Sequence, residues 1–293
     1  MALRHASSCI RHLSSLKGWR GFARLPKSHP RLDTWRLSDL RKQSSKHVDR
    51  GEPGQARLTS QIGVCETGEA ILQALEASEA LNVAHISAAL KRCRTLGDSY
   101  AASDVLELMR RRNIRPGVAI AVEMAALLNI SRKHEEALSW AVLEHPLVAG
   151  QGLSMNPLCY NEAMRACGGL RRPADAHRLL KEAMARDDEF AESEGVVFAS
   201  MKAFTTVIRA YAMCQQLEEA EAVFREMCES RERLPSHLQS SRRADDVMYT
   251  VLMQEWARQG DRAKAEEFYQ RMLSEGWQPD EHCKRIRQKF QLF

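Results

Sequence analysis

The chain has 293 residues, of which 44% are hydrophobic, enough for a real core in one large domain or two small ones. It contains no run of eighteen apolar residues, so the sequence predicts no membrane span. The net charge of +5 is uneven: residues 1–50 hold twelve Lys or Arg and three Asp or Glu, which leaves 31 basic and 35 acidic residues for the rest. The body is therefore no polycation, and nucleic-acid binding would need locally placed cations.

Eight cysteines are scattered along the chain without a Cys-x-x-Cys pair. This pattern is typical of reduced, mostly buried thiols rather than of a zinc site or a disulfide framework. It suits a reducing compartment such as a cytosol or an organelle matrix, and we expect no metal and no cofactor.

The first 32 residues have the composition of a targeting segment. They contain no acidic residue, and apolar residues recur at helical spacing from Leu3 to Leu16 between arginines and serines. This predicts a mitochondrial presequence, with a plastid transit peptide and a plain disordered basic tail as alternatives. Residues 33–82 are interpreted as a linker, to about residue 64, followed by an N-terminal capping helix.

The rest of the chain repeats itself. Five anchor residues each precede an alanine by sixteen positions, and a methionine follows most anchors after 23 or 24 positions. The anchors are Ile86, Ala121, Tyr160, Phe204 and Tyr249, and the alanines are Ala102, Ala137, Ala176, Ala220 and Ala265. The strings around the alanines, such as EEAEAVFREMCES, read as the second helix of a pair.

The distances between successive anchors are 35, 39, 44 and 45 residues, whereas the anchor-to-alanine distance is constant. Insertions therefore fall only after the second helix, in 144–156, 185–200 and 228–245, as expected for stacked helix pairs. A plain amphipathic bundle is the alternative, but it gives no reason for a fixed interval. The predicted units are 83–117, 118–156, 157–200, 201–245 and 246–280, with a C-terminal capping helix at 281–293.

The last unit, VMYTVLMQEWARQGDRAKAEEFYQRMLSEGWQPDE, closely resembles a pentatricopeptide repeat. FTTVIRAYAMCQQLEEAEAVFREM and YNEAMRACGGLRRPADAHRLL look like the same unit, and 118–156 is a degenerate copy. The resemblance covers about 83–280 and implies an all-α, right-handed α-solenoid that binds single-stranded RNA. The rival is the tetratricopeptide repeat, a protein-binding scaffold, whose early Trp and Leu-Gly are missing here.

The resemblance also implies which residues contact bases. In the family, the residue after the anchor and the last residue of the repeat contact the base edge. The first set is Ser87, Val122, Asn161, Thr205 and Thr250, and the closing set is Gly117, Asn156, Ser200, Asp245 and Asp280. Thr with Asp implies guanine in the last two units, Asn161 implies a pyrimidine, and Val122 implies a spacer. Helix N-capping is the alternative role for these polar residues.

Three cations lie one helical turn beyond the predicted base contacts. They are Lys91, Arg165 and Arg209, which would share the concave face and reach phosphates, unless they are only solvated surface charges. Trp256 and Trp277 could stack on bases, although burial between helices is the simpler expectation.

No catalytic motif is complete. His134 and Glu136 form an H-x-E, but the P-C-x-x-C that deaminases also need is missing, and no phosphate loop or metalloprotease motif occurs. We therefore expect no enzyme but a monomeric organellar RNA-binding protein that acts in transcript stabilisation, processing or translation. Its partners would be a transcript or ribosomal RNA and RNA-processing or ribosomal proteins. The alternative is a protein-binding scaffold in an organellar complex.

Overall fold

The structure, a computed structural model, describes residues 53–190, 197–242 and 244–291, and every regular element in these ranges is helical. The predicted presequence lies outside them. The elements are α3 (Pro53–Val64), α4 (Gly68–Glu76), α5 (Val83–Leu96), α6 (Ser99–Arg111), α7 (Val118–Ile130), α8 (His134–Ala141), α9 (Pro157–Gly169), α10 (Pro173–Phe190), α11 (Met201–Met213), α12 (Leu217–Arg233), the 3-10 helix η2 (Ser236–Arg242), α13 (Asp246–Gln259), α14 (Arg262–Ser274) and α15 (Glu281–Phe290).

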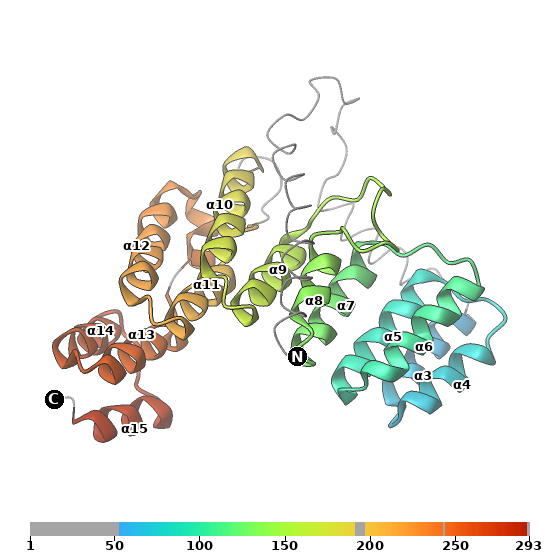
Figure 1. Cartoon of the computed structure of the whole chain (residues 1–293), viewed down its shortest axis with the longest axis horizontal. Coiled ribbons are helices and arrows are strands. Elements are labelled where there is room, and N and C mark those ends of the chain that lie inside the picture. The colour runs from blue at the N-terminus through green and yellow to red at the C-terminus, as the bar shows by residue number, and fades with distance from the viewer. Residues whose placement is uncertain (1–52, 191–196, 243, 292–293) are drawn as a thin grey trace, which may run out of the picture.

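These helices form antiparallel pairs stacked side by side in an arched row (Figure 1). The first helices of successive pairs pack on one another in the order α3, α5, α7, α9, α11, α13 and α15. In Figure 1, α9 and α11 lie toward the inner side of the arch, and α10 and α12 lie on its outer side. The predicted all-α solenoid of helix pairs is confirmed. No described helix has both the length and the hydrophobicity needed to cross a membrane.

The fixed interval of sixteen residues has a packing cause. All five anchors are at most 3% exposed, and all five alanines are completely buried. Each alanine belongs to the second helix of its pair, close to the neighbouring helices, where a larger side chain would force them apart.

The turn inside each pair is equally regular. One residue with a left-handed backbone stands eleven positions after every anchor: Gly97, Arg132, Arg171, Gln215 and Gly260, with φ between 56° and 90°. A left-handed residue ends the first helix and lets the chain reverse, which glycine does at the lowest cost. The chain meets this requirement with glycine in only two of the five pairs.

The predicted linker is wrong for residues 53–64, which form α3. Helix α3 packs on α5, and α4 packs on α6, so the two helices make a sixth pair. Gly68 takes the place of the small alanine, because it lies 34 residues before Ala102 and a Cβ there would clash with Ala101 and Asp98. The alanine interval does not mark this pair because its small residue is glycine.

Two of the three insertions lengthen second helices instead of forming loops. Helix α10 continues to Phe190, and α12 continues to Arg233 before η2. The end of the insertion after α10 is fixed just before α11, because the buried carboxylate of Asp187 accepts hydrogen bonds from the backbone N–H groups of Phe198 (2.5 Å) and Ala199 (3.0 Å). The spacing of the anchors alone could not indicate this contact.

Candidate nucleic-acid interface

The first helices carry the predicted contact residues. Because each anchor is buried, the residue after it is turned by about 100° around the helix and lies at the edge of the core. Ser87, Asn161 and Thr205 are half-buried in this way. The three cations one turn later, Lys91 on α5, Arg165 on α9 and Arg209 on α11, are exposed.

Asn161 is the predicted contact with the clearest unused hydrogen-bonding capacity. Its side-chain oxygen is buried and has no hydrogen-bond partner among the described residues. A buried acceptor without a donor is unfavourable, so a ligand that brings an N–H group to this point would be stabilised.

The two threonines differ. Thr205 Oγ1 donates to the carbonyl oxygen of Met201 (2.9 Å) and remains half-exposed. Thr250 Oγ1 donates to the carbonyl oxygen of Asp246 (2.7 Å), and the residue is only 8% exposed. Helix α15 packs on α13. Burial raises the pKa of the Cys283 thiol on α15, and a hydrogen bond with Thr250 partly lowers it again. The structure therefore leaves Thr250 without a surface that a base could reach.

The closing residues of the repeats are the N-caps of the next first helix. Asn156, Asp245 and Asp280 each accept a hydrogen bond from the backbone N–H three residues later, at 2.9, 2.9 and 2.6 Å. Capping uses Oδ1 of each aspartate and leaves Oδ2 for another partner. Base contacts by Asp245 and Asp280 stay predictions, whereas their capping role is now visible.

Two acidic residues that the repeat pattern did not single out lie on the same set of first helices. Glu123 and Glu162 both stand two positions after an anchor, and each is held by the preceding first helix. Arg94 Nε lies 2.9 Å from Glu123 Oε2, and Asn129 Nδ2 donates to Glu162 Oε2 (2.9 Å) and to the Glu162 carbonyl oxygen (3.0 Å). Their fixed position, two residues after the anchor, could have been recognised in the sequence. These contacts reduce the repulsion that free carboxylates would exert on phosphates.

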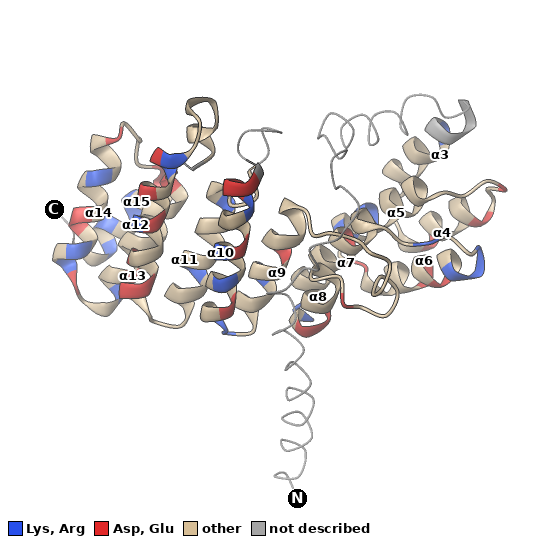
Figure 2. Ribbon diagram, turned by 90° about the horizontal axis from the view of Figure 1, so that it is seen from above, with Lys and Arg blue, Asp and Glu red and all other residues tan. Residues whose placement is uncertain are grey.

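Arg165 is influenced by one of these carboxylates. Its guanidinium lies 3.7 Å from Glu162 Oε2, and half of the Arg165 side chain remains exposed. Figure 2 shows that Lys and Arg are interspersed with Asp and Glu along the described helices. Any attraction for phosphate must therefore come from individual exposed cations.

Exposed apolar side chains also accompany the predicted contacts. Leu158 and Val247 stand two residues before their anchors and are 57% and 44% exposed. A branched aliphatic group in this position can pack on the flat face of an unstacked base. By contrast, Trp256 is 7% exposed and Trp277 is half-buried, so the expected burial is confirmed for Trp256.

The thiols behave as the cysteine pattern predicts. Cys93, Cys159, Cys167 and Cys283 are buried, and every cysteine of the described residues is free. Burial raises the pKa of Cys93, Cys159 and Cys167 to about 11, so these thiols stay protonated at neutral pH.

The fourth and fifth units match a known family model. The family model "PPR repeat" matches residues 202–231 and 247–277. These two segments of the chain are therefore similar to pentatricopeptide repeats. No curated protein matches its sequence significantly.

Solved pentatricopeptide repeat structures share the fold. The crystal structure of PPR10 from maize superimposes with a TM-score of 0.61 at 14% identity, over 86% of this chain and 34% of that one. PPR10 in complex with an 18-nt psaJ RNA element gives a TM-score of 0.52 at 17% identity, over 86% and 33%. The chain thus spans about a third of the length of the PPR10 chains.

Proposed function

We propose that this protein is an organellar single-stranded RNA-binding protein without catalytic activity of its own, acting in transcript stabilisation, processing or translation. The observation that carries the proposal lies on α9. There the unpartnered oxygen of Asn161 and the exposed guanidinium of Arg165 are one helical turn apart, which suits one base and its neighbouring phosphate.

The same arrangement occurs on two other first helices. Thr205 and Arg209 have this spacing on α11, and Ser87 and Lys91 have it on α5. Asn161 is assigned a pyrimidine, and Thr205 with Asp245 is assigned guanine. Since Thr250 is buried under α15, a bound RNA strand has no base-contacting partner at this position. Asp280, which was paired with Thr250 in the assignment of guanine, is therefore left without that threonine.

The proposed footprint is short. Three base-contacting units give modest affinity and specificity, so we propose that the monomer works beside RNA-processing or ribosomal proteins on a transcript or ribosomal RNA. The presequence composition supports the mitochondrion over the plastid. Import of the radiolabelled full chain into isolated mitochondria, with and without a membrane potential, tests this location.

The RNA proposal is tested with Lys91→Ala, Arg165→Ala and Arg209→Ala combined. We expect affinity for single-stranded RNA oligonucleotides to fall at least about tenfold, and the slope of log K against log salt to become shallower by about 2, because three phosphate contacts are lost. Fluorescence anisotropy over a salt series measures both quantities.

The matched control replaces Arg111, Arg225 and Arg262, which are exposed on second helices, by alanine. This variant loses the same charge and should retain most of the affinity and the salt slope. Equal losses in both variants, or no binding of single-stranded RNA by the wild type, would contradict the proposal.

A further inference from the structure

Helix α15 ends the row of first helices. It packs on α13 as each first helix packs on the one before it, and no second helix follows it within the described residues. In Figure 1 it lies at the C-terminal end of the array, next to α13. From residue 282 onward the chain holds no Asp or Glu and four basic residues: Lys284, Arg285, Arg287 and Lys289. Covering the last pair requires a polar outer surface but not one of a single charge.

Helix α15 has the same rotation about its axis as the other first helices. Asp280 caps it as Asn156 caps α9, each accepting a hydrogen bond from the backbone N–H three residues later. Six positions after the N-cap, Glu123 on α7 and Glu162 on α9 are bonded to the preceding first helix. Ile286 takes this position in α15 and is 5% exposed. The equivalent positions of α15 therefore face the same sides.

This rotation places two cations at the contact positions of the row. The predicted base and phosphate contacts stand five and nine positions after the N-cap, as Asn161 and Arg165 do on α9. In α15 these positions hold Arg285 and Lys289, and both are exposed. Residues four apart share a helix face. None of the first helices from α5 to α13 has a cation at both positions.

Both cations are available to a ligand. Arg285 donates through Nε to the carbonyl oxygen of Glu281 (3.1 Å), which leaves the two terminal amino groups of the guanidinium. Lys289 Nζ lies 5.3 Å from the centroid of the Phe290 ring. Neither side chain forms an ion pair with a described residue, so each keeps its full charge for an anion.

The other two cations of α15 are already engaged. Lys284 Nζ lies 2.7 Å from Glu281 Oε1, and Arg287 donates to the hydroxyl oxygen of Tyr269 (3.3 Å). The Arg287 guanidinium also lies 4.8 Å from the centroid of the Tyr269 ring. These contacts fix α15 on the last pair and leave the other two cations as its binding groups.

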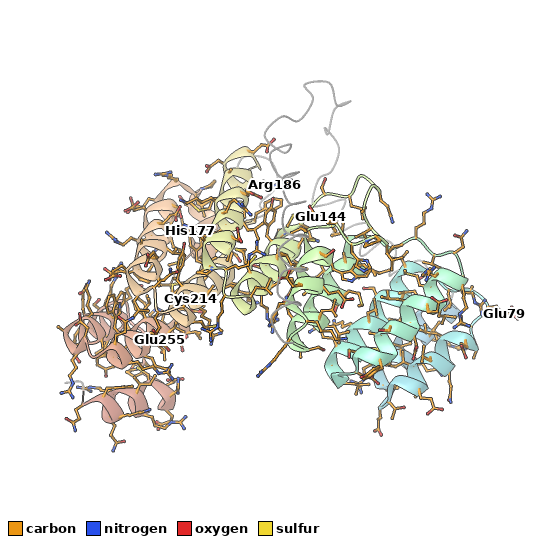
Figure 3. All side chains as sticks on the ribbon, viewed as in Figure 1. Glu79, Glu144, His177, Arg186, Cys214 and Glu255 are labelled. Carbon is orange, nitrogen blue, oxygen red and sulfur yellow. The ribbon has the colours of Figure 1, made fainter. Side chains whose placement is uncertain are left out.

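Acidic side chains lie beside the first turn of α15. Burial, followed by the charges of Asp280 and then Asp246, raises the pKa of the Cys283 thiol, so both carboxylates are close to that turn. In Figure 3, Glu255 lies on α13 above α15, and an ion pair within α13, at 2.6 Å, occupies its carboxylate. The carboxylates thus lie at the start of α15, and the two free cations lie in its later turns.

We propose that α15 binds the phosphate backbone of a single RNA strand, with Arg285 and Lys289 contacting neighbouring phosphates. This inference rests on the proposed RNA-binding function. A strand that follows the first helices meets Gln254 at the phosphate position of α13 and finds Thr250 buried. The next helix, α15, restores the attraction, because guanidinium and ammonium groups bind phosphate oxygens strongly. It holds the strand without reading a base.

The test uses the full chain with Arg285→Ala and Lys289→Ala combined. Its ligand is a fluorescein-labelled oligouridine of about 12 nucleotides, measured by fluorescence anisotropy over a salt series. We expect about fivefold weaker binding and a slope of log K against log salt that is shallower by about 1.4, because each single-strand phosphate contact contributes about 0.7. An oligoadenosine of the same length should lose the same factor, since phosphate contacts carry no sequence information.

Two variants serve as controls. Arg225→Ala with Arg262→Ala removes the same charge from exposed positions on the second helices α12 and α14, and should change neither affinity nor slope appreciably. Arg285→Lys with Lys289→Arg exchanges the two cations but keeps both charges. It should retain wild-type affinity for both oligonucleotides, because either cation can contact a phosphate.

Unchanged RNA affinity after loss of Arg285 and Lys289, in a chain whose Lys91, Arg165 and Arg209 variant binds weakly, would overturn this inference alone. The occupant of α15 would then be an acidic protein surface. An equal loss in the second-helix control, or a loss with only one of the two oligonucleotides, would also overturn it, as general attraction or base reading. No RNA binding by the wild type would contradict the proposed function and this inference with it.

Discussion

Asn129 is a polar side chain buried between the second and third units, and it bonds in three directions. It is 5% exposed, donates twice to Glu162, and its oxygen lies 3.1 Å from Nδ1 of His134. Since the Asn129 oxygen can only accept, Nδ1 of His134 is the donor. One side chain thereby joins α7, α8 and α9.

Replacement of Asn129 by alanine should lower the free energy of unfolding by about 2 kcal/mol, because Glu162 loses a buried donor. Urea unfolding followed by circular dichroism measures this. Asn161→Ala is the matched control: its oxygen has no protein partner, so it should cost little stability but weaken RNA binding several-fold. If Asn161→Ala destabilised the fold as much as Asn129→Ala, the assigned roles would be wrong.

His134 and His145 should make stability depend on pH. Burial, followed by the positive charges of Arg165 and Arg132, holds the pKa of His134 below the usual 6.5, and burial does the same for His145. The unfolded chain then binds more protons just below pH 6.5 than the folded chain, so stability falls as pH is lowered through that value. We expect a lower urea midpoint at about pH 5.5 than at about pH 7.5, and a smaller difference after His134→Gln with His145→Gln.

At the scale of the element, contacts between second helices depend on small residues. The first turn of α4 meets α6 at Gly68, where a Cβ would clash with the Ala101 side chain. In α3, by contrast, a Cβ on Gly63 would meet nothing within 4 Å. The two glycines therefore form an internal comparison within one helix pair.

Gly68→Ala should destabilise the protein by about 1–3 kcal/mol, because α4 must move away from α6. Gly63→Ala should be neutral or stabilise it by up to about 1 kcal/mol, because alanine is the better helix former. Thermal or urea unfolding of the two variants measures the difference. Equal effects of the two substitutions would show that α4 does not pack on α6 as described.

At the scale of the whole molecule, each pair packs mainly on its neighbours, so stability should be a sum of local terms. Ala265 is completely buried in α14 of the last pair. Ala265→Leu should overpack that pair and increase amide hydrogen exchange in α13, α14 and α15, while α3 to α6 keep their protection. Hydrogen exchange read by mass spectrometry distinguishes this from a uniform loss, which would indicate one cooperative unit.

The sequence by itself determined the repeat. The buried anchors and the alanine sixteen residues later recur at fixed spacing because every helix pair packs in the same way. The anchor spacing located the insertions after second helices, but it did not show that two of them extend those helices.

Only the tertiary structure decided which surfaces are available. Thr250 repeats the position of Thr205, yet packing of α15 on the last pair buries it. The partners of Glu123 and Glu162 lie on the preceding first helix, α5 for Glu123 and α7 for Glu162. Exposure is a property of contacts between pairs, and the spacing within one pair carries no information about them.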